Sequence, residues 1–324
     1  MKVSCVDNQK RVILDVDTGI DDALSIMYLL KQPNVIVEGL TTGCGNVSAE
    51  KATENTLKIV ELMGKAGEVP VAMGASQPLL RPWGGPVVAF HGENGIGGIE
   101  LPKPTQKPLE EDAADFIVRK VNEFPNEITL IFVGRLTNLA IALAKDSELP
   151  KKVKELVIMG GAVQVPGNVT PVSEANIAGD PDAAHMVFSA GFNLTMVGLD
   201  VTMEAHFSVN HVEMLKEKCK KSEQHTRLAN LIQEMLVGRF ESYRDYHEVL
   251  GSPLHDPLAV AVALDPTLVE KTPLVVTVET KGTLSLGATI ADLRIGKNVN
   301  PNVNVCLKVE AERFLQHFID SLAS

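Results

Sequence analysis

Short apolar runs alternate with longer amphipathic segments along the first two thirds of the chain. The runs are rich in β-branched residues and nearly continuous, which is typical of strands buried on both faces of a parallel sheet. They predict strands over Val12–Val16, Val35–Thr41, Ile128–Val133, Val153–Met159 and Leu194–Leu199. The segments between them have helical periodicity and predict helices over Asp21–Leu30, Ala49–Met63, Asp112–Asn122, Leu136–Ala144 and Pro181–Ala190. This alternation indicates right-handed βαβ units in an open α/β sheet.

The last third of the chain has a different pattern. Charged helices are expected over Val209–Lys220 and Glu223–Val249, and a further helix opens at HDPLAVAVAL (255–264). A β-hairpin, a strand and a closing helix follow over Leu274–Glu279 with Thr283–Ile290, Val303–Val309 and Ala311–Ala323. With no repeat or linker, we expect one domain over residues 1–324. Its predicted fold is an open, mostly parallel Rossmann-like sheet flanked by helices, with an additional helical region and a C-terminal β-hairpin.

Composition excludes several classes of protein. The formal net charge of −11 argues against binding to nucleic acid or to a membrane surface, both of which require a basic face. No stretch approaches the roughly 20 apolar residues of a membrane span, and MKVSCVDNQKR lacks the apolar core of a signal peptide. We therefore expect a cytoplasmic protein. The cysteines, without CxxC spacing, are expected to be free thiols: Cys5, Cys44, Cys219 and Cys306.

Four aspartates interrupt the first apolar run, which reads VILDVDTGIDDALSI over residues 12–26. Helix capping accounts for one or two of them, since Asp21 and Asp22 open a helix. Asp15 and Asp17 precede the turn, however, and would add repulsion. A bound cation removes this repulsion, and carboxylates without a local His or Cys favour a hard ion, Ca²⁺ or Mg²⁺.

Other polar segments also follow strand ends, where ligands bind in open α/β sheets. They are TTGCGN (41–46), GRLTN (134–138) and MGGAVQVPGNVTPVSEAN (159–176). Alone, GNVTPVSEAN would suit a polar surface loop. Its two amides and one carboxylate, from Asn168, Asn176 and Glu174, would also suit a site that holds several sugar hydroxyls.

Two histidines lie in segments that could join such a site. In LHDP (254–257), Asp256 alone would be read as a helix N-cap, but beside a metal it becomes a plausible further ligand. His255 is then suited to proton transfer near neutral pH. His91 lies in FHGENGIGG (90–98), whose glycines are too irregular for a dinucleotide fingerprint and indicate a mobile loop.

Together these segments resemble the nucleoside hydrolase family, inosine/uridine-preferring type. The family's DxDxGxDDA signature stands at Asp15–Ala23, and its later elements stand as TTGCGN, GRLTN, MGGAV…GNVTPVSEANI and HDPLAV. The resemblance covers nearly the whole chain in the expected order. It implies Ca²⁺-dependent hydrolysis of the N-glycosidic bond of ribonucleosides (inosine, uridine or cytidine) to ribose and free base. It also implies a homodimer or homotetramer that serves nucleoside salvage or catabolism.

The resemblance also implies roles for individual residues. Ca²⁺ would be held by the carboxylates of Asp17, Asp22 and Asp256 and by the backbone carbonyl of Val133. Asp17 would also be the general base for the attacking water, and His255 would face the base as the acid for the leaving group.

The remaining roles concern the substrate. Ribose hydroxyls would be held by Asp21, Asn46, Asn168, Glu174 and Asn176. His91 would cover the site, and Tyr243, with His247 held more loosely, would contact the base. Asp15 would support the aspartates from behind.

Three positions depart from the family pattern or bear on its branches. Thr18 stands for the frequent proline of the signature, and Ala175 stands where many members carry an aromatic residue. The purine-preferring branch stacks the base between tryptophans and lacks the HDP histidine. With Trp83 as its single tryptophan, this chain fits the other branch, while its choice of base stays open.

Other functions fit parts of the pattern. DVDTG also matches the DxDx[TV] motif of haloacid-dehalogenase-type phosphohydrolases, with Asp15 as nucleophile, Asp17 as acid/base, Mg²⁺ as metal and Gly179–Asp182 as second acidic motif. That interpretation leaves HDP and GNVTPVSEAN without a role. A non-catalytic nucleoside- or ribose-binding member of the same fold would keep all these positions. A structural Ca²⁺ protein would leave both histidines unexplained.

Overall fold

The computed structural model describes residues 9–220, 222–247, 251–294, 296 and 299–324. Its centre is an eight-stranded sheet in the order β3-β2-β1-β4-β5-β6-β12-β9. In chain order these strands are β1 Lys10–Val16, β2 Val35–Thr42, β3 Val71–Met73, β4 Ile128–Phe132, β5 Glu155–Met159, β6 Leu194–Val197, β9 Val269–Leu274 and β12 Val303–Val309. All neighbouring pairs are parallel except β12 and β9. The predicted open, mostly parallel sheet is confirmed.

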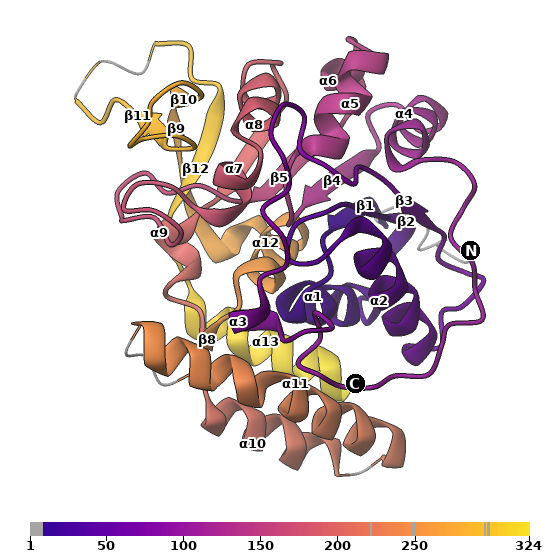
Figure 1. The fold of residues 1–324 in the computed structure, drawn as a ribbon. Coiled ribbons are helices and arrows are strands. Elements are labelled where there is room, and N and C mark those ends of the chain that lie inside the picture. Colours follow the sequence, from indigo (N-terminus) through magenta and orange to yellow (C-terminus); the bar gives the residue numbers. More distant parts are fainter. Residues whose placement is uncertain (1–8, 221, 248–250, 295, 297–298) are drawn as a thin grey trace, which may run out of the picture.

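Helices cover both faces of this sheet (Figure 1). On one face lie α4 Ala113–Glu123, α5 Thr137–Lys145 and α8 Pro181–Phe188. On the other lie α1 Ile20–Leu30, α2 Ala49–Leu62, α12 His255–Leu264 and α13 Ala311–Ala323, with the additional helical region of α10 Val209–Cys219 and α11 Glu223–His247 beyond them. Short helices in the connections are α3 Val88–His91, α6 Leu149–Lys152, α7 Ala175–Gly179, α9 Leu199–Thr202 and the 3₁₀ turn Pro266–Leu268.

The strands build two hydrophobic cores, one on each face. In β1, Val12, Leu14 and Val16 pack with the α1 side, whereas Ile13 packs with the α4 side. This division follows from the two-residue period of a strand, and it explains why the strands read as continuous apolar runs.

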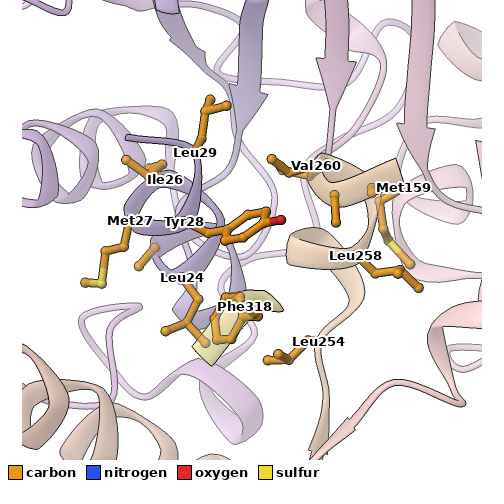
Figure 2. Close-up of a cluster of buried hydrophobic side chains, with 14 of the residues drawn as sticks. Leu24, Ile26, Met27, Tyr28, Leu29, Met159, Leu254, Leu258, Val260 and Phe318 are labelled. Atoms are coloured by element: carbon orange, nitrogen blue, oxygen red, sulfur yellow. The ribbon is translucent and has the colours of Figure 1, made fainter. Parts of the chain in front are cut away.

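Helix α1 is buried almost throughout, because α12 and α13 close around it. Figure 2 shows Tyr28 of α1 among apolar side chains of α12, with Phe318 of α13 beside it. The Tyr28 and Phe318 ring centroids are 5.5 Å apart, and the Tyr28 hydroxyl lies 2.7 Å from Nδ1 of His317. The first turn of α1, which carries Asp21 and Asp22, therefore rests on a rigid support.

Several predicted boundaries were wrong at their ends. The strand predicted to reach Leu199 stops at Val197, because Gly198 caps α9. The C-terminal hairpin exists, but its strands are only β10 Val276–Val278 and β11 Thr289–Ala291, and residues 279–288 connect them. Helix α11 ends at His247, and the last two residues of its predicted range lie outside the described residues.

Two strands of the sheet, β3 and β9, were not predicted. Both lie at edges of the sheet, and the sequence of β9, VEKTPL, has three consecutive polar residues followed by a proline. A proline can be accommodated at an edge because it has no N–H to donate. A second small sheet pairs β7 His206–Phe207 with β8 Ser252–Pro253.

The described cysteines, Cys44, Cys219 and Cys306, are free thiols, as predicted; Cys5 lies outside the described residues. Among the helices that the structure describes, none has the length and apolar character of a membrane span.

Candidate active site

The predicted site residues meet at the carboxyl ends of the central strands. Strand β1 lies between β2 and β4, so the strand order reverses there, and this is where open α/β sheets bind ligands. A cavity of about 140 Å³ opens at this point. Its lining includes Asp21, Asn46, His91, Val133, Asn168, Glu174, Asn176, Tyr243, His255 and Asp256.

Asp17 and Asp22 are held by a dense set of hydrogen bonds. The backbone N–H groups of Asp17 and Gly19 donate to the two carboxylate oxygens of Asp22, at 3.0 and 2.9 Å. Asn46 donates to Asp17 through its backbone N–H and its side-chain amide, both at 2.9 Å, and the same amide lies 3.1 Å from Asp22. Gly45 is required beside them, because a Cβ there would lie 1.6 Å from Asp17 Oδ2. The two carboxylates are therefore fixed before any ligand arrives.

Asp256, at the start of α12, completes an acidic cluster. Single oxygens of Asp21, Asp22 and Asp256 lie within 4.8 Å of one another, and all three side chains are buried. Burial and the neighbouring carboxylates raise the pKa values of Asp22 and Asp256 well above their usual range. Burial also raises the pKa of Asp17. Such a concentration of buried acid is stabilised by a cation, and its oxygen-only donors fit a hard ion.

Asp21 differs from the other three aspartates. Burial opposes its ionisation, but Arg239, His91 and His255 together outweigh burial and lower its pKa. Arg239 Nη2 donates to Asp21 Oδ2 at 2.9 Å. Oδ1 of Asp21 is buried and has no hydrogen-bond partner among the described residues. An orphaned carboxylate oxygen at the cavity wall is a place for a ligand's donor or a cation.

The segment after β5 places an amide beside the carbonyl of Val133. Asn176 Nδ2 donates to the carbonyls of Val133 and Met159, at 2.8 and 3.0 Å. Glu174 caps α7 by accepting from the N–H groups of Gly161, Asn176 and Ile177, at 2.9, 2.8 and 3.1 Å. Burial nevertheless raises the pKa of Glu174 to about 7.

Asn168 stabilises the same loop. Its Oδ1 accepts from the N–H of Ala175 at 3.0 Å. The side chain is therefore fixed where the loop borders the cavity.

His255, which also lines the cavity, lies between two hydroxyl groups. The Tyr243 hydroxyl lies 2.9 Å from His255 Nε2, and the Thr202 hydroxyl lies 2.7 Å from Nδ1. Both ring nitrogens are therefore engaged, so the orientation of the imidazole is fixed. Tyr243 also packs edge-on against Phe90, with the ring centroids 5.3 Å apart.

His91 forms the end of α3, where a mobile loop was expected. Its Nδ1 accepts from the N–H of Ile20 at 3.0 Å, and burial lowers its pKa to about 4. The ring is therefore neutral near pH 7 and braces the first turn of α1. The side chain of His247 lies outside the described part of the structure.

Known proteins with similar sequences identify the family. A family profile described as "Inosine-uridine preferring nucleoside hydrolase" matches residues 12–316. The chain belongs to this family. It is therefore a hydrolase of the glycosidase type that acts on ribonucleosides.

Two curated relatives of this nucleoside hydrolase carry pyrimidine names. The chain is 40% identical over 321 residues to "Uridine nucleosidase 1" of Arabidopsis thaliana, covering 95% of this chain and 91% of the relative. It is 35% identical to "Pyrimidine-specific ribonucleoside hydrolase RihA" of Shewanella baltica (strain OS185), over 97% and 96% of the two chains.

A solved structure with a different preference is equally similar. The "Purine-Preferring Ribonucleoside Hydrolase from Gardnerella vaginalis" superposes with a TM-score of 0.90 at 35% identity, over 97% of this chain and 98% of that chain. A "Plant nucleoside hydrolase", PpNRh1, gives 0.89 at 33%, over 97% and 99%. Overall similarity therefore identifies the fold and the class of reaction. It does not identify the preferred nucleobase, which depends on local contacts in the site.

Sequence reasoning about this nucleoside hydrolase missed Arg239 and Thr202. Arg239 lies among many charged residues of α11, a helix that reads as solvent-exposed, yet its side chain is 3% exposed. Its one signal is the four-residue spacing to Tyr243, which places both on the same helix face. Thr202 carried no signal, because only the turn after β6 brings it to His255.

The structure removes the second acidic motif of the phosphohydrolase alternative from the site. Asp180 caps α8 and accepts from Leu79 N, Thr137 Oγ1 and Ala183 N, while Asp182 pairs with Arg81. Asp15, the nucleophile in that alternative, is buried, and its Oδ2 accepts from Thr41 at 2.6 Å and from Asn138 at 2.8 Å. It supports the end of β1 from behind the cavity.

Proposed function

We propose that this enzyme hydrolyses the N-glycosidic bond of ribonucleosides, uridine among them, in a Ca²⁺-dependent reaction. The observation that carries the proposal is that one cavity combines two kinds of group. Asp21 and Asp256, which cluster with the buried Asp22, line the same cavity as His255, whose ring lies between two hydroxyls. The pyrimidine names of the curated relatives support uridine as a substrate.

Oxygen donors that suit Ca²⁺ surround the acidic end. Asp17, Asp22 and Asp256 would hold the ion with the carbonyl of Val133, and the orphaned oxygen of Asp21 marks the same wall as able to receive a donor or cation. When bound, Ca²⁺ would anchor ribose hydroxyls and the attacking water and offset the carboxylate charges.

Asp17 is proposed as the general base. Its carboxylate is fixed by two hydrogen bonds from Asn46, and its pKa is raised by burial, so it can accept a proton from the attacking water. Cleavage develops positive charge on the sugar, as in other glycosyl transfers with oxocarbenium-like transition states. The surrounding carboxylates stabilise that charge without moving.

The ribose is proposed to lie between α1 and the loop before α7. Its hydroxyls would contact Asp21, Asn46, Asn168, Glu174 and Asn176. Glu174 and Asn168 already use oxygens to hold the loop. Their contribution is therefore in large part to present Asn176 at a fixed position.

His255 is proposed to protonate the leaving base, with Tyr243 and Thr202 orienting its ring. Replacing His255 with Ala should slow uridine hydrolysis by about 10²–10⁴-fold. A 4-nitrophenyl riboside, whose leaving group needs no proton, should be little affected. His185→Ala, at an exposed position on α8, is the control. Equal losses on both substrates would remove His255 as the acid.

The experiment that tests the function is a nucleoside panel assayed for free base and ribose. Uridine, cytidine and inosine are compared with a generic phosphate ester. Ribose release from uridine supports the proposal, whereas phosphate release alone would establish the phosphohydrolase alternative. Binding without turnover would establish a nucleoside sensor.

The arrangement of the whole protein is a further expectation. We expect a single domain that assembles as a homodimer or homotetramer in the cytoplasm and serves nucleoside salvage or catabolism. Light scattering after size-exclusion chromatography measures the assembly, and a monomeric mass would contradict it.

A further inference from the structure

Arg239 links helix α11 to Asp21 in the first turn of α1, and both residues line the cavity. It lies on α11, and its Nη2 donates to Asp21 Oδ2 at 2.9 Å while its Nε donates to Ser252 Oγ at 2.6 Å. The guanidinium also lies 5.3 Å from the ring centroid of Tyr243, one helical turn later. Burial of a charged arginine is costly unless it is paired, and here the pairing partner is a residue of the site.

The ion pair leaves the two oxygens of Asp21 in different states. Oδ2 is occupied by Arg239, whereas Oδ1 is buried without a hydrogen-bond partner in the described structure. His91 Nδ1 is 4.0 Å from Oδ1, but that nitrogen already accepts from Ile20 and has no proton to give. A carboxylate held through one oxygen cannot rotate freely, so the ion pair with Arg239 fixes the direction of Oδ1.

We propose that Arg239 is a positioning residue that fixes Asp21 so that Oδ1 receives one ribose hydroxyl, and that it thereby sets the preference for ribonucleosides over deoxyribonucleosides. The inference rests on the proposed function, which places Asp21 at the ribose. A buried acceptor with no partner rewards a substrate that supplies the missing donor. It penalises a substrate that lacks the donor, because the oxygen then stays desolvated and unpaired.

The substitutions that test this separate charge from geometry. Arg239→Met keeps the length of the side chain and removes both hydrogen bonds, and Arg239→Lys keeps the charge but loses the planar fork. Arg227→Met is the matched control, because Arg227 lies on the same helix but is exposed and pairs only with Glu223 at the surface. For each variant, kcat/KM is measured on uridine, 2′-deoxyuridine and 3′-deoxyuridine.

The readout is the ratio of kcat/KM for uridine to that for each deoxynucleoside. We expect Arg239→Met to reduce one of the two ratios by about tenfold or more, the value of a hydrogen bond to a charged group. Arg239→Lys should give an intermediate ratio, and Arg227→Met should give the wild-type ratio. Asp21→Asn should reduce the same ratio, and combining it with Arg239→Met should add little, because both act on one contact.

Several outcomes would overturn the proposal. If Arg239→Met slows all three substrates equally and leaves both ratios unchanged, Arg239 has a structural role only. If Arg239→Met fails to fold by circular dichroism, the Arg239→Lys ratio decides, and a wild-type ratio counts against the proposal. A wild-type enzyme that releases no ribose from uridine would instead overturn the proposed function, and with it this inference.

Discussion

The charged residues near the two ends of strand β1 differ in how far they are paired. At the amino end, Glu38 pairs with Arg11 and Lys120, and Arg11 also pairs with Glu127 at 3.2 Å and stacks over Phe124. At the carboxyl end, Asp17, Asp21, Asp22 and Asp256 are buried, and Arg239, the one fully buried arginine among the described residues, pairs with Asp21. One end is balanced, and the other carries an excess of negative charge.

This difference separates what stabilises the fold from what performs its chemistry. Balanced charges at the amino end satisfy one another and require no ligand. At the carboxyl end, burial and mutual repulsion raise the pKa values of Asp22 and Asp256, so these carboxylates oppose folding in their ionised form, and a bound cation would offset that cost. Charge is therefore balanced at one end of the strand, and at the other end the strand positions a buried acidic cluster that suits a cation.

Removing divalent cations should have the largest effect. Chelation with EGTA is expected to abolish ribose release and to lower the melting temperature, because Ca²⁺ bound only by the folded state stabilises it in proportion to its concentration. At about 100 times Kd the contribution is about 2.7 kcal/mol. Activity assays and thermal melts, with Ca²⁺ added back, measure both effects. Full activity in a sample that elemental analysis shows to be metal-free would show that the acidic cluster does not act through a bound cation.

Asp17→Asn should affect activity at the unbalanced end without weakening the fold. We expect kcat to fall by about 10³-fold because the general base is lost. The metal-free variant should be at least as stable as the metal-free wild type, since one buried negative charge is removed. Urea unfolding measures the free energy. A large loss of stability would show that Asp17 is structural.

Glu38→Gln makes the opposite change at the balanced end. The variant should lose about 1–2 kcal/mol of unfolding free energy, because Arg11 and Lys120 keep their charges without the partner that neutralised them. Its kcat/KM should be unchanged. Glu148→Gln, whose pair with Lys151 is exposed, is the control and should change stability by less than about 0.5 kcal/mol. Reduced turnover in Glu38→Gln would show that the two ends are coupled.

The last prediction concerns the pH dependence of stability. Because burial raises the pKa of Glu174 to about 7 from 4.5, the folded state holds this proton more tightly than the unfolded state. The stability linked to Glu174 is therefore fully present below pH 4.5 and is lost as pH rises to about 7. Urea unfolding of metal-free wild type and Glu174→Gln across this range should show a smaller decline in the variant. Identical slopes would mean that Glu174 folds in its ionised form.

Among the strands of the central sheet, the sequence predicted those that helices cover on both faces and missed the two edge strands, β3 and β9. The strands near Val12 and Ile128 are continuous apolar runs because helices cover both faces. Edge strand β9 is half polar and carries Pro273, so its pairing with β12 depends on a partner distant in sequence. The apolar pattern of a sequence indicates burial, and a strand at the edge of a sheet is less buried than a central strand.

The sequence pointed to candidate site residues where chemical groups are concentrated in a short segment. Asp17, Asp22 and His255 stand out because several unusual groups occur together. Arg239 could not be found in this way, because its role depends on which face of α11 turns toward Asp21. The choice of Asp21, and not Asp17, as the partner of that arginine also depends on side-chain directions that spacing does not encode.

The support of α1 by α13 has a consequence for the order of synthesis. Tyr28 is synthesised long before its partners, because His317 lies 289 residues further along the chain and Phe318 follows it. Strand β12, beside β6 in the sheet, is also late. Contacts between distant parts of a chain form slowly, and incomplete chains expose apolar surface. The first turn of α1, which carries Asp21 and Asp22, can therefore reach its final packing only after α13 has been synthesised and has docked.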